Sequence, residues 1–162
     1  MIRFKKFDKD KRGTIRYWFW HCLAFNVTAI RLGRWKPKYI FHDMEKPILM
    51  LLTGGDYQAV RNWHREHNRH HLSYKGHLER DWEAMAIDWE CSNLTKNACP
   101  MKFMDKLYNM RTVKGLTDNA YLSLIYYGTR IGLCNPTQAI SHVIRTEQVN
   151  EYGGPVVDKD ED

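Results

Sequence analysis

The sequence predicts an all-α protein of about seven helices. Apolar residues recur at helical spacing through most of its 162 residues, and no segment alternates as a half-buried strand does. Residues that favour helix ends separate these segments, with Thr14, Pro37 and Pro136 at starts and Gly33 at a stop. The hydrophobic content is 43% and the aromatic content 13%, which is typical of a folded chain.

The first two predicted helices carry the first candidate site residues. One face of the helix that ends near Gly33 carries Trp18, His21, Cys22 and Phe25, so His21 points with the apolar face. Pro37 opens a second helix, which carries the adjacent pair His42-Asp43 together with Ile40, Phe41 and Met44. Pro47 removes one backbone hydrogen bond, and we expect it to kink or restart this helix.

The remaining helices follow in order. After the turn at 53–56, a third helix runs from Tyr57 into a group of histidines, and 73–76 breaks it. A fourth helix has Glu79, Asp81 and Glu83 in its first turn, and Asp88 lies two turns after Asp81. Three more helices are indicated by their start residues, which are Pro100, Thr117 with Asp118, and Asn135-Pro136.

Charge divides the chain into three parts. A basic arm over 1–13, expected to be mobile or to bind an anion, precedes a single helical domain over 14–152. An acidic, disordered tail is expected over 153–162. The net charge is +6; residues 158–162 hold four acids and one lysine, or −3, which leaves +9 for the rest. This balance favours anionic ligands such as nucleotides, other phosphate esters or nucleic acid.

Compartment and membrane association follow from the cysteines and the apolar segments. The four cysteines show no CxxC pair, which is typical of reduced thiols in the cytoplasm. The apolar run at 17–30 is too short to span a bilayer and contains His21 and Asn26, so we interpret it as a core helix and expect no membrane association.

Five of the eight histidines lie between His64 and His77. At about 100° per residue, His64, Asn68 and His71 share one narrow helix face, with His67 at its edge and His70 well off it. This geometry presents at least two imidazoles to one point. The alternative is a polar helix surface that happens to be rich in histidine.

A wider set of ionisable residues favours a metal site. Six residues sit on or beside apolar faces of four successive predicted helices: His21, His42, Asp43, His64, His71 and Asp88. Burying so many ionisable groups without partners is costly, whereas neutral imidazoles and carboxylates are metal ligands. This mixed ligand set, without a thiolate cluster, suits Mn²⁺, Fe²⁺, Co²⁺ or Ni²⁺ better than Mg²⁺ or a structural zinc.

The order of these residues resembles the HD-domain metal-dependent phosphohydrolases. Their motif is a His, then a His-Asp pair, then an Asp, which His21, His42-Asp43 and Asp88 match. Members with two metals add a His and a His-His pair, which His64 and His70-His71 match. The chain is also similar to a small bacterial and phage family with HDxSK, HxxxNxHHPEH and DLxEMxxDW motifs, although Glu45 and Leu72-Ser73 depart from the pattern.

The resemblance implies an HD-like helical bundle that holds one or two divalent metal ions. The six residues of the wider set would be the ligands, and Lys46, Asp43 and His70 would act in catalysis. Lys46, Arg65 and Arg69 would bind phosphate. Asn68 would orient a ligand or a water, and Asp81 would either hold a histidine or favour the start of its helix.

The expected function is hydrolysis of a nucleotide or another phosphate ester, in the cytoplasm, or in the host cytoplasm for a phage-encoded protein. Two alternatives stay open: a phage-like protein that binds or sequesters a nucleotide or signalling ligand without cleaving it, and a basic helical protein that binds nucleic acid. Glu45 bears on this choice. It would repel a phosphate, pair with Lys46 or point away, and pairing with Lys46 would favour a changed substrate or none.

Overall fold

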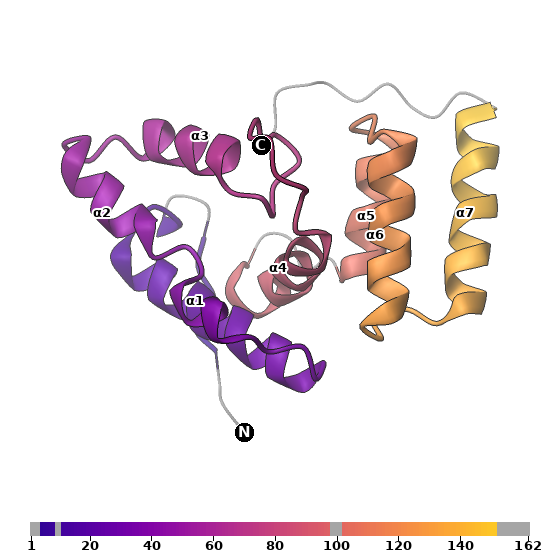
Figure 1. The fold of residues 1–162 in the computed structure, drawn as a ribbon, viewed down its shortest axis with the longest axis horizontal. Coiled ribbons are helices and arrows are strands. Elements are labelled where there is room, and N and C mark those ends of the chain that lie inside the picture. The colour runs from indigo at the N-terminus through magenta and orange to yellow at the C-terminus, as the bar shows by residue number, and fades with distance from the viewer. Residues whose placement is uncertain (1–3, 9–10, 98–101, 152–162) are drawn as a thin grey trace. The chain divides into compact units, whose positions relative to one another are not determined.

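The computed structural model describes residues 4–8, 11–97 and 102–151 (Figure 1). Over these residues the chain forms seven α-helices and one 3₁₀ helix, which confirms the predicted all-α class. The chain divides into two compact units, Met1–Pro100 and Met101–Asp162, and the single domain over 14–152 stays a prediction. Each unit is described by itself.

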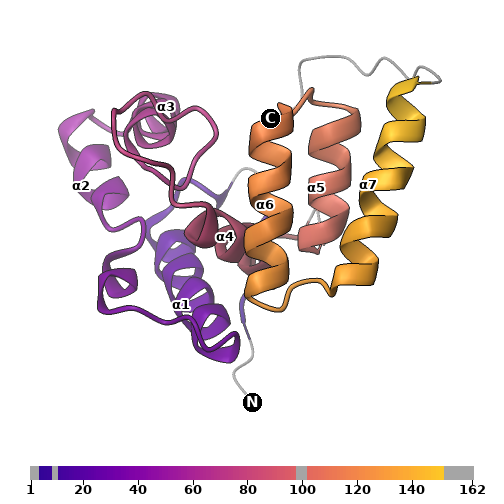
Figure 2. The ribbon, with the colours of Figure 1, turned by 45° about the vertical axis from the view of Figure 1, so that its right-hand side comes forward.

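The N-terminal unit is built around α1 (Ile15–Arg31) and α4 (Trp82–Thr95), which pack against each other (Figure 2). The Thr14 side chain caps α1 by accepting from Tyr17 N, and the helix ends just before Gly33 at φ +65°. Between α1 and α4 come η2 (Pro37–Phe41), α2 (Glu45–Leu52) and α3 (Tyr57–His67). The predicted start and stop of α1 are therefore confirmed.

The core of this unit is densest along α4. Residues 82–89 are all buried, Asp88 among them, and α1 contributes Trp18, Ala24 and Phe25 from its facing side. The Phe7 N–H donates to the Thr95 carbonyl at 2.8 Å, and its ring packs with Tyr17. The arm predicted to be mobile is thus packed at Phe7. The predicted tail at 153–162, Cys99 and Pro100 lie outside the described residues.

The His42-Asp43 pair does not lie on a helix, and that prediction was wrong. Helix η2 ends at Phe41, and α2 begins only at Glu45. Between them Asp43 adopts φ +61°. Pro47 is the physical reason, because its ring would meet the Asp43 carbonyl in a continuous helix. The chain therefore turns at the pair, and Pro47 falls in the first turn of α2, where a missing N–H is tolerated.

Helix α3 also ends earlier than expected. It stops at His67, and Asn68 caps it by donating its N–H to the His64 carbonyl at 2.9 Å. His70 and His71 therefore lie in the following turn, where the His71 N–H donates to the Asn68 carbonyl at 3.1 Å. The helical projection that set His70 apart does not apply to this segment.

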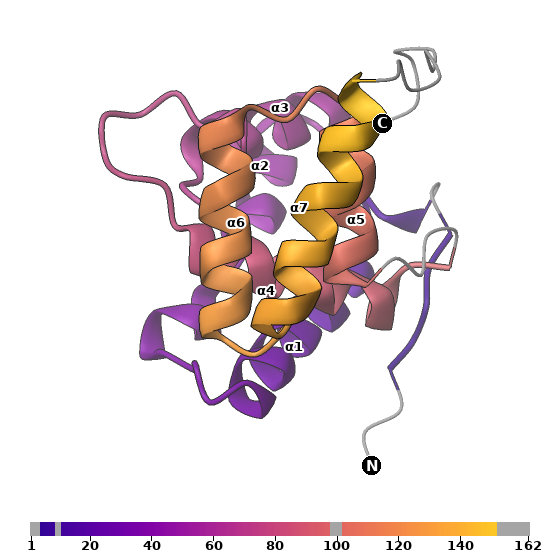
Figure 3. The same cartoon turned by 90° about the vertical axis from the view of Figure 1, so that its right-hand side faces the viewer.

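The C-terminal unit consists of α5 (Phe103–Thr112), α6 (Asp118–Arg130) and α7 (Pro136–Glu151), which pack against one another in all three pairs (Figure 3). Thr117 caps α6, and Pro136 begins α7, as predicted. Among the described residues, no helix has both the length and the apolar character needed to cross a membrane.

Phe25 links the core to the turn that carries His42-Asp43, and its removal tests this link. Its side chain is buried and stacks on the His42 ring, with 3.7 Å between ring centroids. We expect Phe25→Ala to lower the free energy of unfolding by about 3–5 kcal/mol, because the cavity cannot close fully. Phe19→Ala, on the exposed side of α1, should change it by less than about 0.5 kcal/mol in the same urea titration. Equal losses in the two variants would contradict this role for Phe25.

Candidate metal centre

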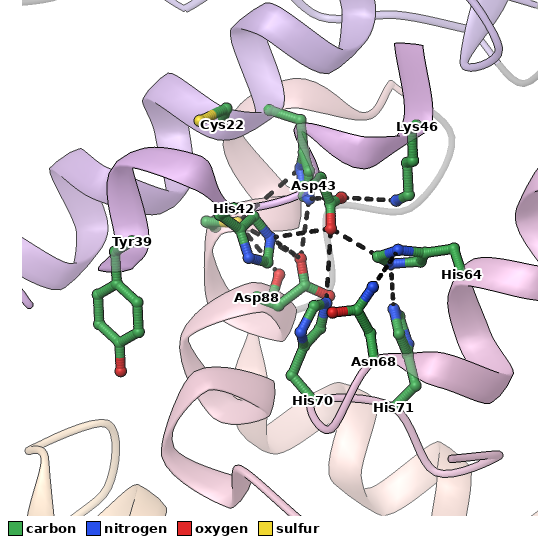
Figure 4. A network of polar contacts seen from close by, with 12 residues as sticks. Cys22, Tyr39, His42, Asp43, Lys46, His64, Asn68, His70, His71 and Asp88 are labelled. Atoms are coloured by element: carbon green, nitrogen blue, oxygen red, sulfur yellow. Dashed lines mark hydrogen bonds and ion pairs between the residues drawn. The ribbon is translucent and has the colours of Figure 1, made fainter. Parts of the chain in front are cut away.

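Asp43 stands at the centre of a group of imidazoles contributed by several elements (Figure 4). The turn that carries it is held from α1, because Asn26 Nδ2 donates to the Tyr39 carbonyl at 2.7 Å and Phe25 stacks on His42. Left-handed backbone is uncommon for a residue with a side chain, although Asp tolerates it better than most. These contacts from α1 hold the Asp43 side chain in a buried position.

The two carboxylate oxygens of Asp43 have different surroundings. Three imidazole Nε2 atoms lie near Oδ1, those of His64 at 3.2 Å, His70 at 3.5 Å and His42 at 3.6 Å. Oδ2 accepts from Lys46 Nζ at 2.5 Å and lies 3.5 Å from His21 Nε2. Lys46 therefore neutralises one side of the carboxylate, while the other side faces the histidines.

Asp88 brings a second buried carboxylate from α4. Its Oδ1 lies 2.9 Å from His21 Nε2 and 3.7 Å from His42 Nε2. The backbone carbonyl of Asp88 accepts from Cys91 Sγ and Ser92 Oγ on the next turn. Two carboxylates far apart in the sequence thus share His21 and His42, as the order of the predicted ligands suggested.

His64 connects this centre to Glu45 and His71. The two Nε2 atoms of His64 and His71 are 2.6 Å apart, while His64 Nδ1 contacts Glu45 Oε1. Asn68 Nδ2 donates to the same Glu45 oxygen at 2.8 Å. If Nδ1 carries the proton that Glu45 accepts, Nε2 keeps its lone pair and faces Asp43. Glu45 therefore neither pairs with Lys46 nor points away from the site.

Three buried polar atoms at this centre have no hydrogen-bond partner among the residues that the structure describes: His42 Nε2, Asp43 Oδ1 and His70 Nε2. The oxygen lies 3.5–3.6 Å from the two nitrogens, which is too long for a good hydrogen bond. His64 Nε2 is nearer, at 3.2 Å, but has no proton to donate when Nδ1 carries it. Atoms bound to one ion at about 2.1 Å each lie about 3.0–3.4 Å apart, close to this spacing. Four overlapping groups of residues here could hold a metal ion: His64, His70 and His71; His21, Asp88 and Cys91; His21, His42 and Asp43; Asp43, Glu45 and His64.

The protonation states suit a cation. Burial lowers the pKa of His42 to about 4 despite the opposing effect of Asp43, and burial also lowers the pKa values of His64 and His71. For Asp43 and Asp88, burial acts to raise the pKa, but the neighbouring histidines, with Lys46 beside Asp43, bring it well below the usual value. Neutral imidazoles and ionised carboxylates are the forms that bind metals.

The charge of the directly contacting groups also favours a cation. The pKa of Glu45 is lowered as well, mainly by its contact with His64 against the opposing effect of burial. Three carboxylates, Asp43, Glu45 and Asp88, therefore face one ammonium, that of Lys46, which leaves −2 with the histidines neutral. A divalent cation would neutralise this charge, which is buried at Asp43 and Asp88 and partly exposed at Glu45.

A pocket of about 330 Å³ reaches the centre from the surface. Its lining includes His42, Asp43 and His70, which carry the three atoms without partners. Two cationic side chains, Lys38 and Arg69, also line it. The centre is therefore accessible to a small ligand. Arg69 lies beside the path, whereas Lys38 is paired with Asp81, which also lines the pocket.

The other predicted site residues have defined places. Asp81 caps α4 by accepting from Ala84 N and pairs with Lys38 at 2.5 Å, which corresponds to the helix-start role. Arg69 lines the pocket and donates through Nε to the Glu79 carbonyl, whereas Arg65 is not among the lining residues. His67, which the prediction left out of the ligand set, is exposed and stacks on Trp63.

Sequence reasoning missed two contacts of the site. Lys38 was not considered, because its partner Asp81 lies 43 positions away and no motif joins them. The contact of Glu45 with His64 spans 19 positions and was equally invisible. A carboxylate two residues after a candidate ligand is the signal that could have suggested Glu45.

Comparisons of the chain with protein-family models, with curated proteins and with solved structures found no match. The fold and the site therefore define the class of protein on their own. It is an all-α protein whose buried His and Asp residues form groups that could hold a metal ion. Cys91 and Glu45 each belong to one of these groups.

The lowered histidine pKa values predict a pH-dependent stability for the metal-free chain. His42 takes up a proton near pH 6.5 when unfolded but only near pH 4 when folded, so stability is full above pH 6.5 and falls as the pH drops toward 4. We expect His42 alone to cost about 2 kcal/mol between pH 7 and pH 5. Urea titrations in EDTA at the two pH values measure this loss, and His42→Gln should reduce it. An unchanged free energy of unfolding would contradict a buried, neutral His42.

Proposed function

We propose that the chain is a metal-dependent phosphohydrolase that acts on a nucleotide or another phosphate ester. The observation that carries the proposal is the set of three buried atoms without hydrogen-bond partners, on three residues that line a pocket: His42, Asp43 and His70. The order of His21, His42-Asp43 and Asp88 along the chain, which resembles the HD-domain phosphohydrolases, supports the same reading.

The donor atoms suit one or two divalent transition metals such as Mn²⁺, Fe²⁺, Co²⁺ or Ni²⁺. His21, His42, Asp43 and Asp88 would hold one ion, and His64, His70 and His71 offer a further set of nitrogens next to it. A bound ion supplies Lewis acidity toward a phosphoryl oxygen and lowers the pKa of water. Asp43 also forms a group with Glu45 and His64, which links the two sets and is compatible with either number of ions.

Other residues would orient these donors. Lys46 holds Asp43 Oδ2 and so leaves Oδ1 toward the imidazoles. Glu45 fixes the ring of His64 through Nδ1, and Asn68 holds Glu45 in turn. Carboxylates that accept from the far nitrogen of a ligand histidine typically strengthen metal binding 10–100-fold. Glu45, which departs from the family motif, would thus serve the centre.

Substrate charge would be met by Lys38 and Arg69 in the pocket. An ammonium has three donors, so Lys46 could also contact a phosphoryl oxygen while it stays on Asp43. In the reaction, water attacks phosphorus, the P–O bond to the alcohol breaks, and the alcohol leaves with a proton. With a single ion on His21, His42, Asp43 and Asp88, His70 would not be a ligand, and its Nε2, which has no hydrogen-bond partner among the described residues, would be suited to exchange that proton.

Metal content and phosphate release test the proposal together. Purified protein should carry a transition metal by plasma mass spectrometry and release phosphate from at least one compound of a nucleotide panel. His42→Ala with Asp43→Ala should remove the metal and lower phosphate release at least about 100-fold, because the Lewis acid is lost. His77→Ala, an exposed histidine outside the pocket lining, is the control and should retain both.

Three outcomes would contradict the proposal. Full metal content in the double variant would rule out this centre. Recovery of an unchanged nucleotide after denaturation, with no phosphate released, would indicate a sequestering protein. Affinity for DNA or RNA that falls steeply with salt and survives metal removal would indicate a nucleic-acid-binding protein.

The two arginines predicted to bind phosphate differ in position, so comparing them tests whether the substrate binds in the pocket. Arg69 lines the pocket and Arg65 does not. We expect Arg69→Met to raise KM about tenfold with a smaller change in kcat, because a charge at the pocket wall binds substrate and transition state alike. Arg65→Met should leave both constants within about twofold. Steady-state kinetics on the best substrate of the panel decide this, and a larger effect from Arg65→Met would place the substrate elsewhere.

A further inference from the structure

The first two residues of α2 are charged, and the rest of the helix is apolar. Glu45 and Lys46, at its start, contact His64 and Asp43 in the metal centre. All six residues after them, 47–52, are apolar. None of the residues of α2 is buried. The charged residues of the helix are therefore turned to the site, while its apolar residues remain without a full covering in the N-terminal unit.

The exposed apolar side chains form a strip that begins before α2. It consists of six residues, each 49–80% exposed: Ile40, Phe41, Met44, Ile48, Leu51 and Leu52. Met44, the N-cap of α2, shares one helix face with Ile48, Leu51 and Leu52, whereas Ile40 and Phe41 lie at the end of η2. We call these six residues the apolar strip.

The area of the apolar strip suits an interface between subunits. Large apolar side chains at this exposure present on the order of 100 Å² each, or several hundred Å² together. A standard interface buries about 800 Å² per partner, of which about 65% is apolar in homodimers. The apolar strip by itself would supply most of the apolar area that one subunit buries in such an interface.

We infer that a second copy of this chain docks on the apolar strip, α2 against α2, in a two-fold symmetric dimer. A two-fold interface uses the same patch on both subunits, so the patch must complement itself. The apolar strip carries no charge that would meet its own copy. Its leucines, isoleucine and methionine at helical spacing can interdigitate as the seams of paired helices do.

The charges disfavour a lipid surface as the occupant. Helices that bind anionic lipid typically carry Lys or Arg along their polar face. The only lysine of α2, Lys46, is 16% exposed in its side chain and donates to Asp43 in the centre. Beside Ile40 and Phe41, Lys36 and Lys38 already pair with Glu83 and Asp81. A lipid headgroup would therefore have to compete with these carboxylates for the basic residues next to the apolar strip.

A second copy docked on the apolar strip would lie beside the pocket. Phe41 belongs to the apolar strip and also to the pocket lining, and it is 70% exposed. Each subunit would therefore have its pocket at the edge of the interface. This inference does not depend on the metal or on phosphohydrolase activity, since it rests on the outer side of α2.

Sedimentation equilibrium of the full chain over a range of concentrations tests the dimer. The wild type should have the mass of two chains. Leu51→Glu should raise the dissociation constant at least about 100-fold, because each copy would bury an unpaired carboxylate. The matched control is Ile30→Glu on α1, which replaces a residue of similar exposure outside the apolar strip and should leave the dimer intact. Both positions are exposed, so circular dichroism should show both variants folded.

Several results would overturn the inference. One is a wild type that remains one chain at all concentrations. Another is a dimer that Leu51→Glu leaves unchanged or that Ile30→Glu dissociates equally. A monomeric wild type that sediments with phosphatidylglycerol vesicles, and loses this in Leu51→Glu, would assign the apolar strip to lipid instead.

Discussion

The N-terminal unit depends on burying Asp43 as an ion. An ionised carboxylate removed from water costs several kcal/mol unless charges and hydrogen bonds replace the water. Here α1 supplies His21, α2 supplies Lys46, and α3 with its following turn supplies His64 and His70. Asp43 Oδ1 still lacks a hydrogen-bond partner. A cation at that atom would complete the set, so metal binding and the stability of this unit would be linked.

Local features of the fold could be predicted from the sequence because they depend on neighbours in the chain. Thr14 and Thr117 cap helices, and Gly33 takes the positive φ that follows α1. The turn at Asp43 could not be predicted in this way. Its conformation is held by Asn26 and Phe25, which come from a different helix, and no spacing in the sequence records those contacts.

The histidines show that a contact can be predicted correctly although the secondary structure of one partner is predicted wrongly. The helical projection brought His64 and His71 together, and their Nε2 atoms do lie 2.6 Å apart. The helix nevertheless ends at His67, and a turn returns the chain toward the centre. The same turn brings His70 to Asp43, although a continuous helix would have kept it away. Helix ends were thus the limiting part of the site prediction, because one turn changes which side chains converge.

Helix α2 links the order of the site to whatever covers the apolar strip. An eight-residue helix is marginal by itself, and α2 has no buried residue to hold it in place. Its first turn nevertheless carries Glu45 and Lys46, which orient His64 and Asp43. Burial of Ile48, Leu51 and Leu52 against a second copy would stabilise the whole helix, its first turn included. Dimer formation would then stabilise the positions of Glu45 and Lys46, which orient His64 and Asp43. The second copy would add no residue to the centre itself.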